Sequence, residues 1–149
     1  MNPVLAVTDL KKHFPIKKGL LNREVAKVYA VDGVSFSLEK GQTLGLVGES
    51  GCGKSTVART ILRLLDPTAG QVLINGIDVT HLSNKELRPI RRQAQIIFQD
   101  PFSSLDPRMT AEDIVGELLT VHGNFTAAQI GTRVADLFEK VGLRSDQLK

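Results

Sequence analysis

The residues best suited to chemistry lie between Gly48 and Ser55, where the sequence reads Gly-Glu-Ser-Gly-Cys-Gly-Lys-Ser. Its glycines let the backbone curl, so that successive N–H groups point toward one centre. We expect Lys54 to bridge the β- and γ-phosphates of a nucleotide, Ser55 to ligate Mg²⁺, and Thr56 to place a hydroxyl near the α-phosphate. The predicted phosphate site comprises Gly48, Glu49, Ser50, Gly51, Cys52, Gly53, Lys54, Ser55 and Thr56.

The elements on either side of this loop are the ones that such a site requires. Residues 43–47 form a short apolar run that predicts a buried strand before the loop. Residues 54–65 have helical periodicity, and Pro and Gly in residues 66–70 predict the end of that helix. A helix N-terminus carries partial positive charge, which favours a phosphate at this point.

The rest of the sequence predicts a β-rich first part and a helical second part. Alternating or apolar runs predict strands at residues 4–16, 27–31, 34–38, 71–74 and 94–98. Ser83 with Glu86 predicts a capping box for a short helix that Pro89 breaks or kinks. Thr110 and Thr126 are predicted to cap two further helices, which run to about residues 122 and 142. The expected fold class is α/β.

Composition narrows the class of protein. The apolar fraction is 42%, which suffices for a packed core, and no apolar run approaches the ~20 residues of a membrane span. The net charge is +3, and basic residues cluster at residues 11–12, 17–18 and 88–92. These clusters suit a solvated surface, a phosphate site or a position near an anionic membrane. No aromatic residues interleave with them as a nucleic-acid groove requires, so we expect no nucleic-acid partner.

Cys52 is the single cysteine, so the chain has no internal disulfide and a reducing compartment is expected. Within the loop it serves either as a small residue or as a redox-active thiol at a helix N-terminus. The nucleotide is also open at this level, because the loop motif occurs in kinases, GTPases and ATPases. The string nearest to the guanine-reading Asn-Lys-x-Asp is Asn84-Lys85-Glu86-Leu87, which lacks the Asp.

Three segments together resemble the ATPases of ABC transporters. They are Val-Asp-Gly-Val-Ser-Phe at residues 31–36, the phosphate loop through Thr56, and Ile-Phe-Gln-Asp-Pro at residues 97–101. The run from Gln99 to Thr110 is similar to the ATPase subunits of oligopeptide and dipeptide importers, and residues 10–15 resemble their F-type subunit. The resemblance covers essentially the whole chain and implies a P-loop NTPase core with an N-terminal antiparallel β region.

The resemblance implies roles for further residues. Gln99 corresponds to the Q-loop glutamine, whose side chain approaches Mg²⁺ and the attacking water. Phe14 corresponds to the aromatic residue that stacks on adenine, with Tyr29 as the reserve candidate because the loop between them leaves the placement open. Either aromatic residue could instead belong to the core. The implied domains are an ATP-binding core at residues 1–100 and a Q-loop with a partial helical subdomain at residues 101–149.

The family also requires segments that these 149 residues do not contain: a Leu-Ser-Gly-Gly-Gln signature, a Walker B strand ending in Asp-Glu, and a later switch histidine. His13, His81 and His122 all precede the expected place of that histidine. We therefore expect an incomplete ABC domain that keeps its phosphate-binding residues without hydrolysing ATP. We also expect residues 43–47, without the Walker B strand beside them, to expose an apolar edge.

The implied function is ATP-driven uptake of peptides or related small solutes. The implied partners are a second ATPase subunit in a head-to-tail dimer, two membrane permease subunits and an external solute-binding protein, at the cytoplasmic face of the inner membrane. Two alternatives remain. One is a non-catalytic, truncated fragment that binds nucleotide, and the other is an ABC-type ATPase that acts on DNA or ribosomes.

Overall fold

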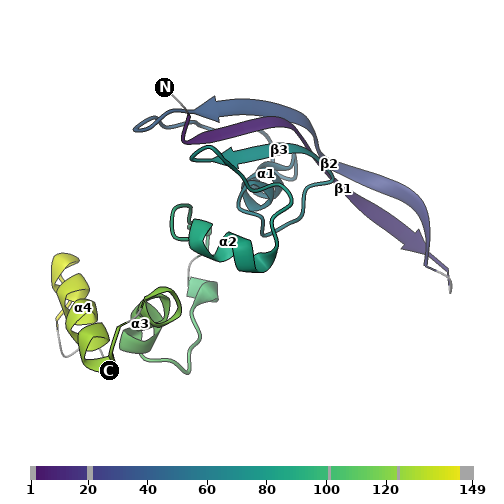
Figure 1. Cartoon of the computed structure of the whole chain (residues 1–149). Coiled ribbons are helices and arrows are strands. Elements are labelled where there is room, and N and C mark those ends of the chain that lie inside the picture. Colours follow the sequence, from purple (N-terminus) through teal and green to yellow (C-terminus); the bar gives the residue numbers. More distant parts are fainter. Residues whose placement is uncertain (1–2, 20–21, 101, 124, 145–149) are drawn as a thin grey trace. The chain divides into compact units, whose positions relative to one another are not determined.

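The computed structural model describes residues 3–19, 22–100, 102–123 and 125–144 of the chain. The chain divides into two compact units, Met1–Gln95 and Ile96–Lys149, which Figure 1 shows as a β-rich part and a helical part. The two units are described separately below.

The first unit is built on a four-stranded antiparallel sheet. Its strands are β1 (Leu5–Lys18), β2 (Arg23–Leu38), β3 (Ala69–Ile74) and β4 (Ile77–Asp78), in the order β2-β1-β3-β4. The strands predicted at residues 4–16, 27–31, 34–38 and 71–74 are thus confirmed. Because β1 lies between β2 and β3, it is the strand that holds the sheet together.

The core of this unit lies where α1 (Lys54–Ile61) packs on β1 and β2. Leu10 and Val31 of the sheet are buried in one cluster with Val57 and Ile61 of the helix. Burying a side chain of this size stabilises the fold by about 1.5–3 kcal/mol. These contacts fix the face of the sheet against which the helix lies.

Helix α1 is shorter than its periodicity predicts, since it ends at Ile61 rather than Leu65. Arg63 adopts a left-handed conformation with φ 53° and turns the chain out of the helix. Its largely buried guanidinium donates to the main-chain oxygens of Val79, at 3.0 Å, and Leu82, at 3.0 Å, and it also pairs with Asp66. Hydrogen bonds to these distant acceptors hold the chain in its turn out of the helix. The periodicity of apolar residues carries no information about such long-range contacts, so it predicts a longer helix.

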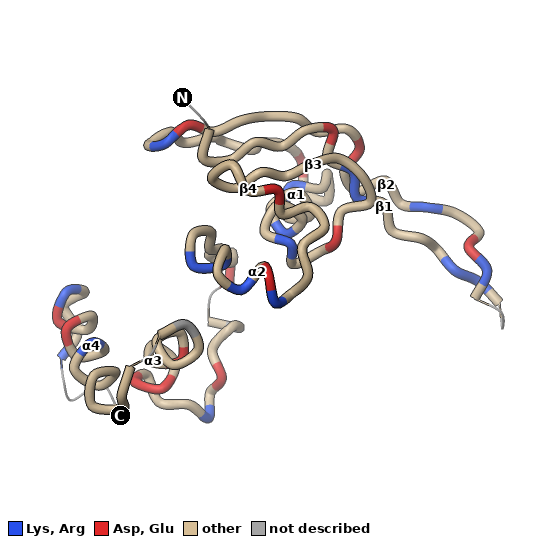
Figure 2. The backbone as a smooth tube through the Cα atoms, viewed as in Figure 1, with Lys and Arg blue, Asp and Glu red and all other residues tan. Residues whose placement is uncertain are grey.

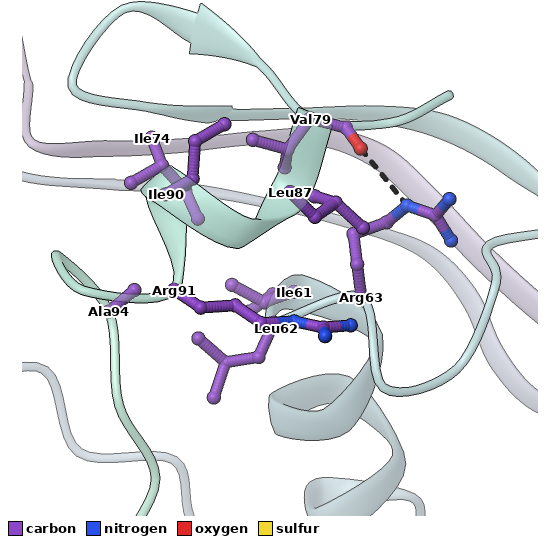
Figure 3. A pocket seen from close by; sticks show the side chains of 9 residues that line it. All are labelled: Ile61, Leu62, Arg63, Ile74, Val79, Leu87, Ile90, Arg91 and Ala94. Atoms are coloured by element: carbon purple, nitrogen blue, oxygen red, sulfur yellow. Dashed lines mark hydrogen bonds between the residues drawn. The ribbon is translucent and has the colours of Figure 1, made fainter. Parts of the chain in front are cut away.

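Figure 3 shows the same region, where side chains of α1, β3 and α2 (Asn84–Ile90) meet. Ile61, Ile74, Leu87 and Ile90 line a cavity of about 10 Å³. That volume holds one water molecule at most, so the cavity is a packing defect and not a ligand site. The predicted capping box of Ser83 and Glu86 is confirmed at the start of α2, and Pro89 lies inside the helix, one residue before its end.

Two predicted strands are not formed. Residues 43–47 and 94–98 have no strand conformation, and within the described residues neither segment pairs with the sheet. A strand exists only when its N–H and C=O groups meet those of a neighbour. The apolar side chains that would be buried are open to solvent, with Val47 90% and Ile97 91% exposed. This agrees with the expectation that residues 43–47 expose apolar surface.

The second unit contains a 3-10 turn at Phe102–Ser104 and the helices α3 (Ala111–His122) and α4 (Ala127–Lys140). Thr110 and Thr126 cap these helices as predicted, and each forms a full capping box. The helices pack closely because Gly116 offers no side chain where Ile130 approaches, at 3.1 Å from a Cβ placed there. Among the described residues, no helix is long and apolar enough to cross a membrane.

Gly70 allows a test of how β3 is held against β1. Its φ is 92°, and a Cβ placed there would lie 2.6 Å from the Cα of Leu10. Gly76→Ala is the matched control, because Gly76 has φ 78° with open space around it. We expect Gly76→Ala to lower the free energy of unfolding by about 1–2 kcal/mol, which is the cost of a left-handed alanine, and Gly70→Ala to lower it by clearly more.

The measurement is urea unfolding followed by the fluorescence of Tyr29. The chain has one tyrosine and no tryptophan, so this signal reports on the first unit alone. Equal losses for the two variants would mean that β1 and β3 can separate enough to admit a methyl group.

Candidate phosphate-binding site

The loop before α1 ends at Gly53, which is the N-cap of the helix. Gly53 has φ 100° and makes no side-chain cap, and the first turn of α1 contains no acidic residue. The first N–H groups of a helix have no acceptor within the helix. Because the N-cap residue here is a glycine, no side chain at that position accepts a hydrogen bond from them. The partial positive charge of the helix end therefore meets no carboxylate of its own first turn.

Gly53 is also the point at which the loop touches the sheet. A Cβ at this position would overlap the main-chain oxygen of Ala30 in β2. Both the left-handed φ and this close approach exclude any residue with a side chain. The start of α1 is thereby placed directly against β2.

Lys54 turns back over the loop. Its ammonium donates to the main-chain oxygens of Gly48, at 2.7 Å, and Glu49, at 2.6 Å, and lies 3.5 Å from the sulfur of Cys52. The ammonium of Lys54 is thus held against the first residues of the loop, and its side chain does not extend into solvent. These are neutral acceptors, so an anion brought to the same place would bind the ammonium more strongly.

The other predicted loop residues lie around this lysine. Ser55 is exposed on the first turn of α1, and Thr56 is half-buried beside it. Cys52 is exposed and free, and a side chain at Gly48 would come within 2.7 Å of its sulfur. Glycine at position 48 therefore leaves room for the side chain of Cys52, and the role of Cys52 stays open.

The two aromatic candidates lie on opposite faces of the sheet. Along β1, side chains alternate, so Leu10, Lys12 and Phe14 share one face. Leu10 packs against α1, and the ammonium of Lys12 lies 4.9 Å from the centre of the Phe14 ring. Phe14 therefore faces the side on which α1 and its loop lie.

Tyr29 pairs with His13 across the ladder and so takes the other face. Their rings meet edge to face, with centroids 4.4 Å apart, and the Nε2 of His13 lies 3.1 Å from a carboxylate oxygen of Asp32. His13 is thus engaged in contacts with Tyr29 and Asp32. Tyr29 lies on the face of the sheet away from the phosphate loop.

Gln99 belongs to the second unit and is exposed. In the described part of the chain, no three His, Cys, Asp or Glu side chains are grouped so that they could hold a metal ion. A role for Ser55 and Gln99 toward Mg²⁺ thus stays a prediction, in which phosphate oxygens supply further ligands.

Sequence reasoning missed two residues that position the loop. Ala30 contributes only its main-chain oxygen, and Arg63 fixes the far end of α1 through main-chain acceptors. Neither role depends on a recognisable pattern of side chains. The one available signal was the glycine at position 53, which marks a close approach without identifying its partner.

The chain belongs to the ABC transporter family, whose model matches residues 31–148. It is 51% identical over 141 residues to the oligopeptide transport ATP-binding protein AppF of Bacillus subtilis, covering 94% of this chain and 43% of that protein. It is 50% identical over 141 residues to the glutathione import ATP-binding protein GsiA of Escherichia coli, covering 95% of this chain and 23% of that protein. The chain thus spans less than half the length of these relatives.

Comparison with solved structures also finds ATP-binding cassettes. The chain is similar to the ATP-binding cassette MJ0796 in a dimeric post-hydrolysis state bound to ADP and Pi, with a TM-score of 0.76 and 27% identity. The likeness covers 97% of this chain and 60% of that one. A second dimeric structure of the same bacterial cassette gives a TM-score of 0.75. The predicted family and fold class, an α/β ABC ATPase core with an N-terminal antiparallel region, are confirmed.

Proposed function

We propose that this chain binds MgATP at residues 48–56 and is the nucleotide-binding part of an ATPase subunit that drives the import of peptides or related small solutes. The observation that carries the proposal is the position of Lys54. Its ammonium lies over the curl of the loop, beside the uncapped start of α1. The relatives, which are oligopeptide and glutathione import proteins, support the class of solute.

In this proposal each loop residue has one task. The ammonium of Lys54 exchanges two main-chain oxygens for oxygens of the β- and γ-phosphates, because charged acceptors form the stronger hydrogen bonds. The N–H groups at the start of α1 bind further phosphate oxygens. The exposed hydroxyl of Ser55 ligates Mg²⁺, and Thr56 contributes its hydroxyl near the α-phosphate. Gln99 is assigned to Mg²⁺ and the attacking water by its position in the family motif.

Phe14 is the aromatic residue that we assign to adenine. By the alternation of β1 it shares a face with Leu10, which packs against α1, and it is half-buried. Tyr29 is engaged with His13 on the opposite face. This difference in faces supports the first candidate over the reserve.

The partners follow the same proposal. A second ATPase subunit would complete a head-to-tail dimer, as dimers occur in the similar cassette. Two permease subunits and a solute-binding protein would place the assembly at the cytoplasmic face of the inner membrane. Residues 1–100 would supply the ATP-binding core, and residues 101–149 the Q-loop and part of the helical subdomain.

We further propose that these 149 residues alone bind nucleotide without steady hydrolysis. They contain no Asp-Glu pair after an apolar strand and no Leu-Ser-Gly-Gly-Gln segment. The first would polarise the attacking water, and the second would close the site of the partner subunit. The activity of the longer relatives would then require sequence additional to that present here.

The first test is the removal of the lysine charge. Lys54→Ala deletes a charge-assisted contact worth about 1.5–3 kcal/mol, so we expect the Kd for MgATP to rise about ten- to a hundredfold. Titration calorimetry measures this directly. Lys40→Ala is the matched control, because Lys40 is an exposed lysine in a turn. Similar losses in both variants would contradict a specific role for Lys54.

The second test separates the two aromatic residues. Base stacking on an aromatic side chain is worth about 1–3 kcal/mol, so we expect Phe14→Ala to weaken ATP binding by about tenfold. Binding of tripolyphosphate, which has no base, should be unchanged in the same variant. Tyr29→Ala should leave both affinities within about twofold. A loss of tripolyphosphate binding in Phe14→Ala would indicate a structural role for that ring.

The third test concerns turnover. We expect the release of phosphate from MgATP by the 149-residue chain to equal that of its Lys54→Ala variant, measured under conditions in which titration shows the wild-type site to be filled. Steady release that Lys54→Ala abolishes would contradict the proposed absence of hydrolysis while supporting the proposed site.

A further inference from the structure

The β1–β2 hairpin continues well beyond the sheet. Strand β1 pairs with β3 only between Leu5 and Lys11, and past that point β1 and β2 pair only with each other. Figure 1 shows this arm projecting from the unit, away from α1 and α2. We define the outer hairpin as residues 15–18 and 23–28, all of which are exposed. A two-stranded ribbon without cover is marginally stable in water, which raises the question of what this one contacts.

Positive charge gathers at the end of the outer hairpin, where Figure 2 shows a group of basic residues. The outer hairpin contains four basic side chains and one carboxylate, that of Glu24. A carboxylate oxygen of Glu24 lies 3.3 Å from the ammonium nitrogen of Lys27. Lys18 lies directly opposite Arg23 in the ladder. Like charges in this position destabilise a hairpin, and an anion between them relieves the repulsion. The cations of the outer hairpin are Lys17, Lys18, Arg23 and Lys27.

Apolar side chains are exposed on the same arm. Ile16 is 40%, Val25 55% and Val28 50% exposed. Val25 is the extra residue where the register shifts between the pairs Ile16–Ala26 and Lys17–Glu24, so it has no direct partner across the ladder. Cations and aliphatic side chains thus occupy one narrow projection without any larger surface to bury the apolar groups.

We propose that the outer hairpin contacts an anionic lipid surface. Its lysines and arginine would bind headgroup phosphates, while Ile16, Val25 and Val28 would enter the boundary between headgroups and acyl chains. A bilayer is the partner that offers both kinds of surface together. The described residues of the outer hairpin include no aromatic side chain on which the bases of a single-stranded nucleic acid could stack.

A second basic cluster supplies the comparison. Helix α2 and the turn after it carry Lys85, Arg91 and Arg92, all exposed, but the large apolar residues of that helix, Leu87 and Ile90, are buried. Its charge is therefore available without exposed apolar neighbours. If net charge alone drove lipid binding, the two clusters would contribute equally.

The experiment is co-sedimentation of the 149-residue chain with phosphatidylcholine vesicles, with and without phosphatidylglycerol. One triple variant carries Lys17→Gln, Lys18→Gln and Arg23→Gln, and the matched control carries Lys85→Gln, Arg91→Gln and Arg92→Gln. Each basic residue near an anionic membrane strengthens binding roughly fivefold, so we expect the hairpin variant to lose about a hundredfold. The control variant should lose much less.

A double variant, Val25→Thr with Val28→Thr, keeps every charge and the strand preference. We expect it to weaken binding to the anionic vesicles by about tenfold, through the lost apolar contact. Lys54→Ala should bind vesicles like the wild-type chain, so the outcome is separable from that of nucleotide binding. Circular dichroism of each variant verifies the fold.

Three results would overturn the proposal. They are an absence of binding to anionic vesicles, equal losses in the two triple variants, and binding that the threonine variant leaves unchanged. Hairpin-dependent binding to duplex DNA without binding to vesicles would assign the arm to a nucleic acid instead.

Discussion

The contact between Gly53 and the main-chain oxygen of Ala30 is the constraint on which the rest of the first unit depends. It leaves no room for a side chain, so the start of α1 has one available position on β2. The burial of Val57 and Ile61 against Leu10 then fixes the direction of the helix. The loop closed between these contacts holds the ammonium of Lys54 beside the start of α1.

The far end of α1 is held by a different kind of interaction. Arg63 reaches main-chain oxygens that lie sixteen and nineteen residues further along the chain. The helix is thus positioned at its N-cap, Gly53, by a close steric contact and just after its last turn by the hydrogen bonds of Arg63. Together they make α1 a rigid element of only eight residues. An isolated helix of that length would not be stable in water, so tertiary contacts hold it.

The sequence predicts local features well and tertiary ones poorly, for physical reasons. The helix caps at Ser83, Thr110 and Thr126 are predicted because their hydrogen bonds join residues three apart. The strands at residues 43–47 and 94–98 are not formed because a strand needs a partner that its own residues do not specify. The phosphate loop was recognised from its motif and family membership is confirmed, but which aromatic residue faces the loop follows only from the alternation of β1.

The irregular register of the hairpin has a consequence for how this family can vary. Between the pairs Lys12–Val31 and His13–Tyr29, β2 contains one unpaired residue, Ala30. Removing Ala30 would restore regular pairing and leave the outer pairs on their present faces, because each residue of β2 shares the face of its partner in β1. The same deletion would withdraw the carbonyl against which Gly53 rests. Selection at this position therefore acts on the number of residues more than on their identity, so substitutions should accumulate in β2 where insertions and deletions do not.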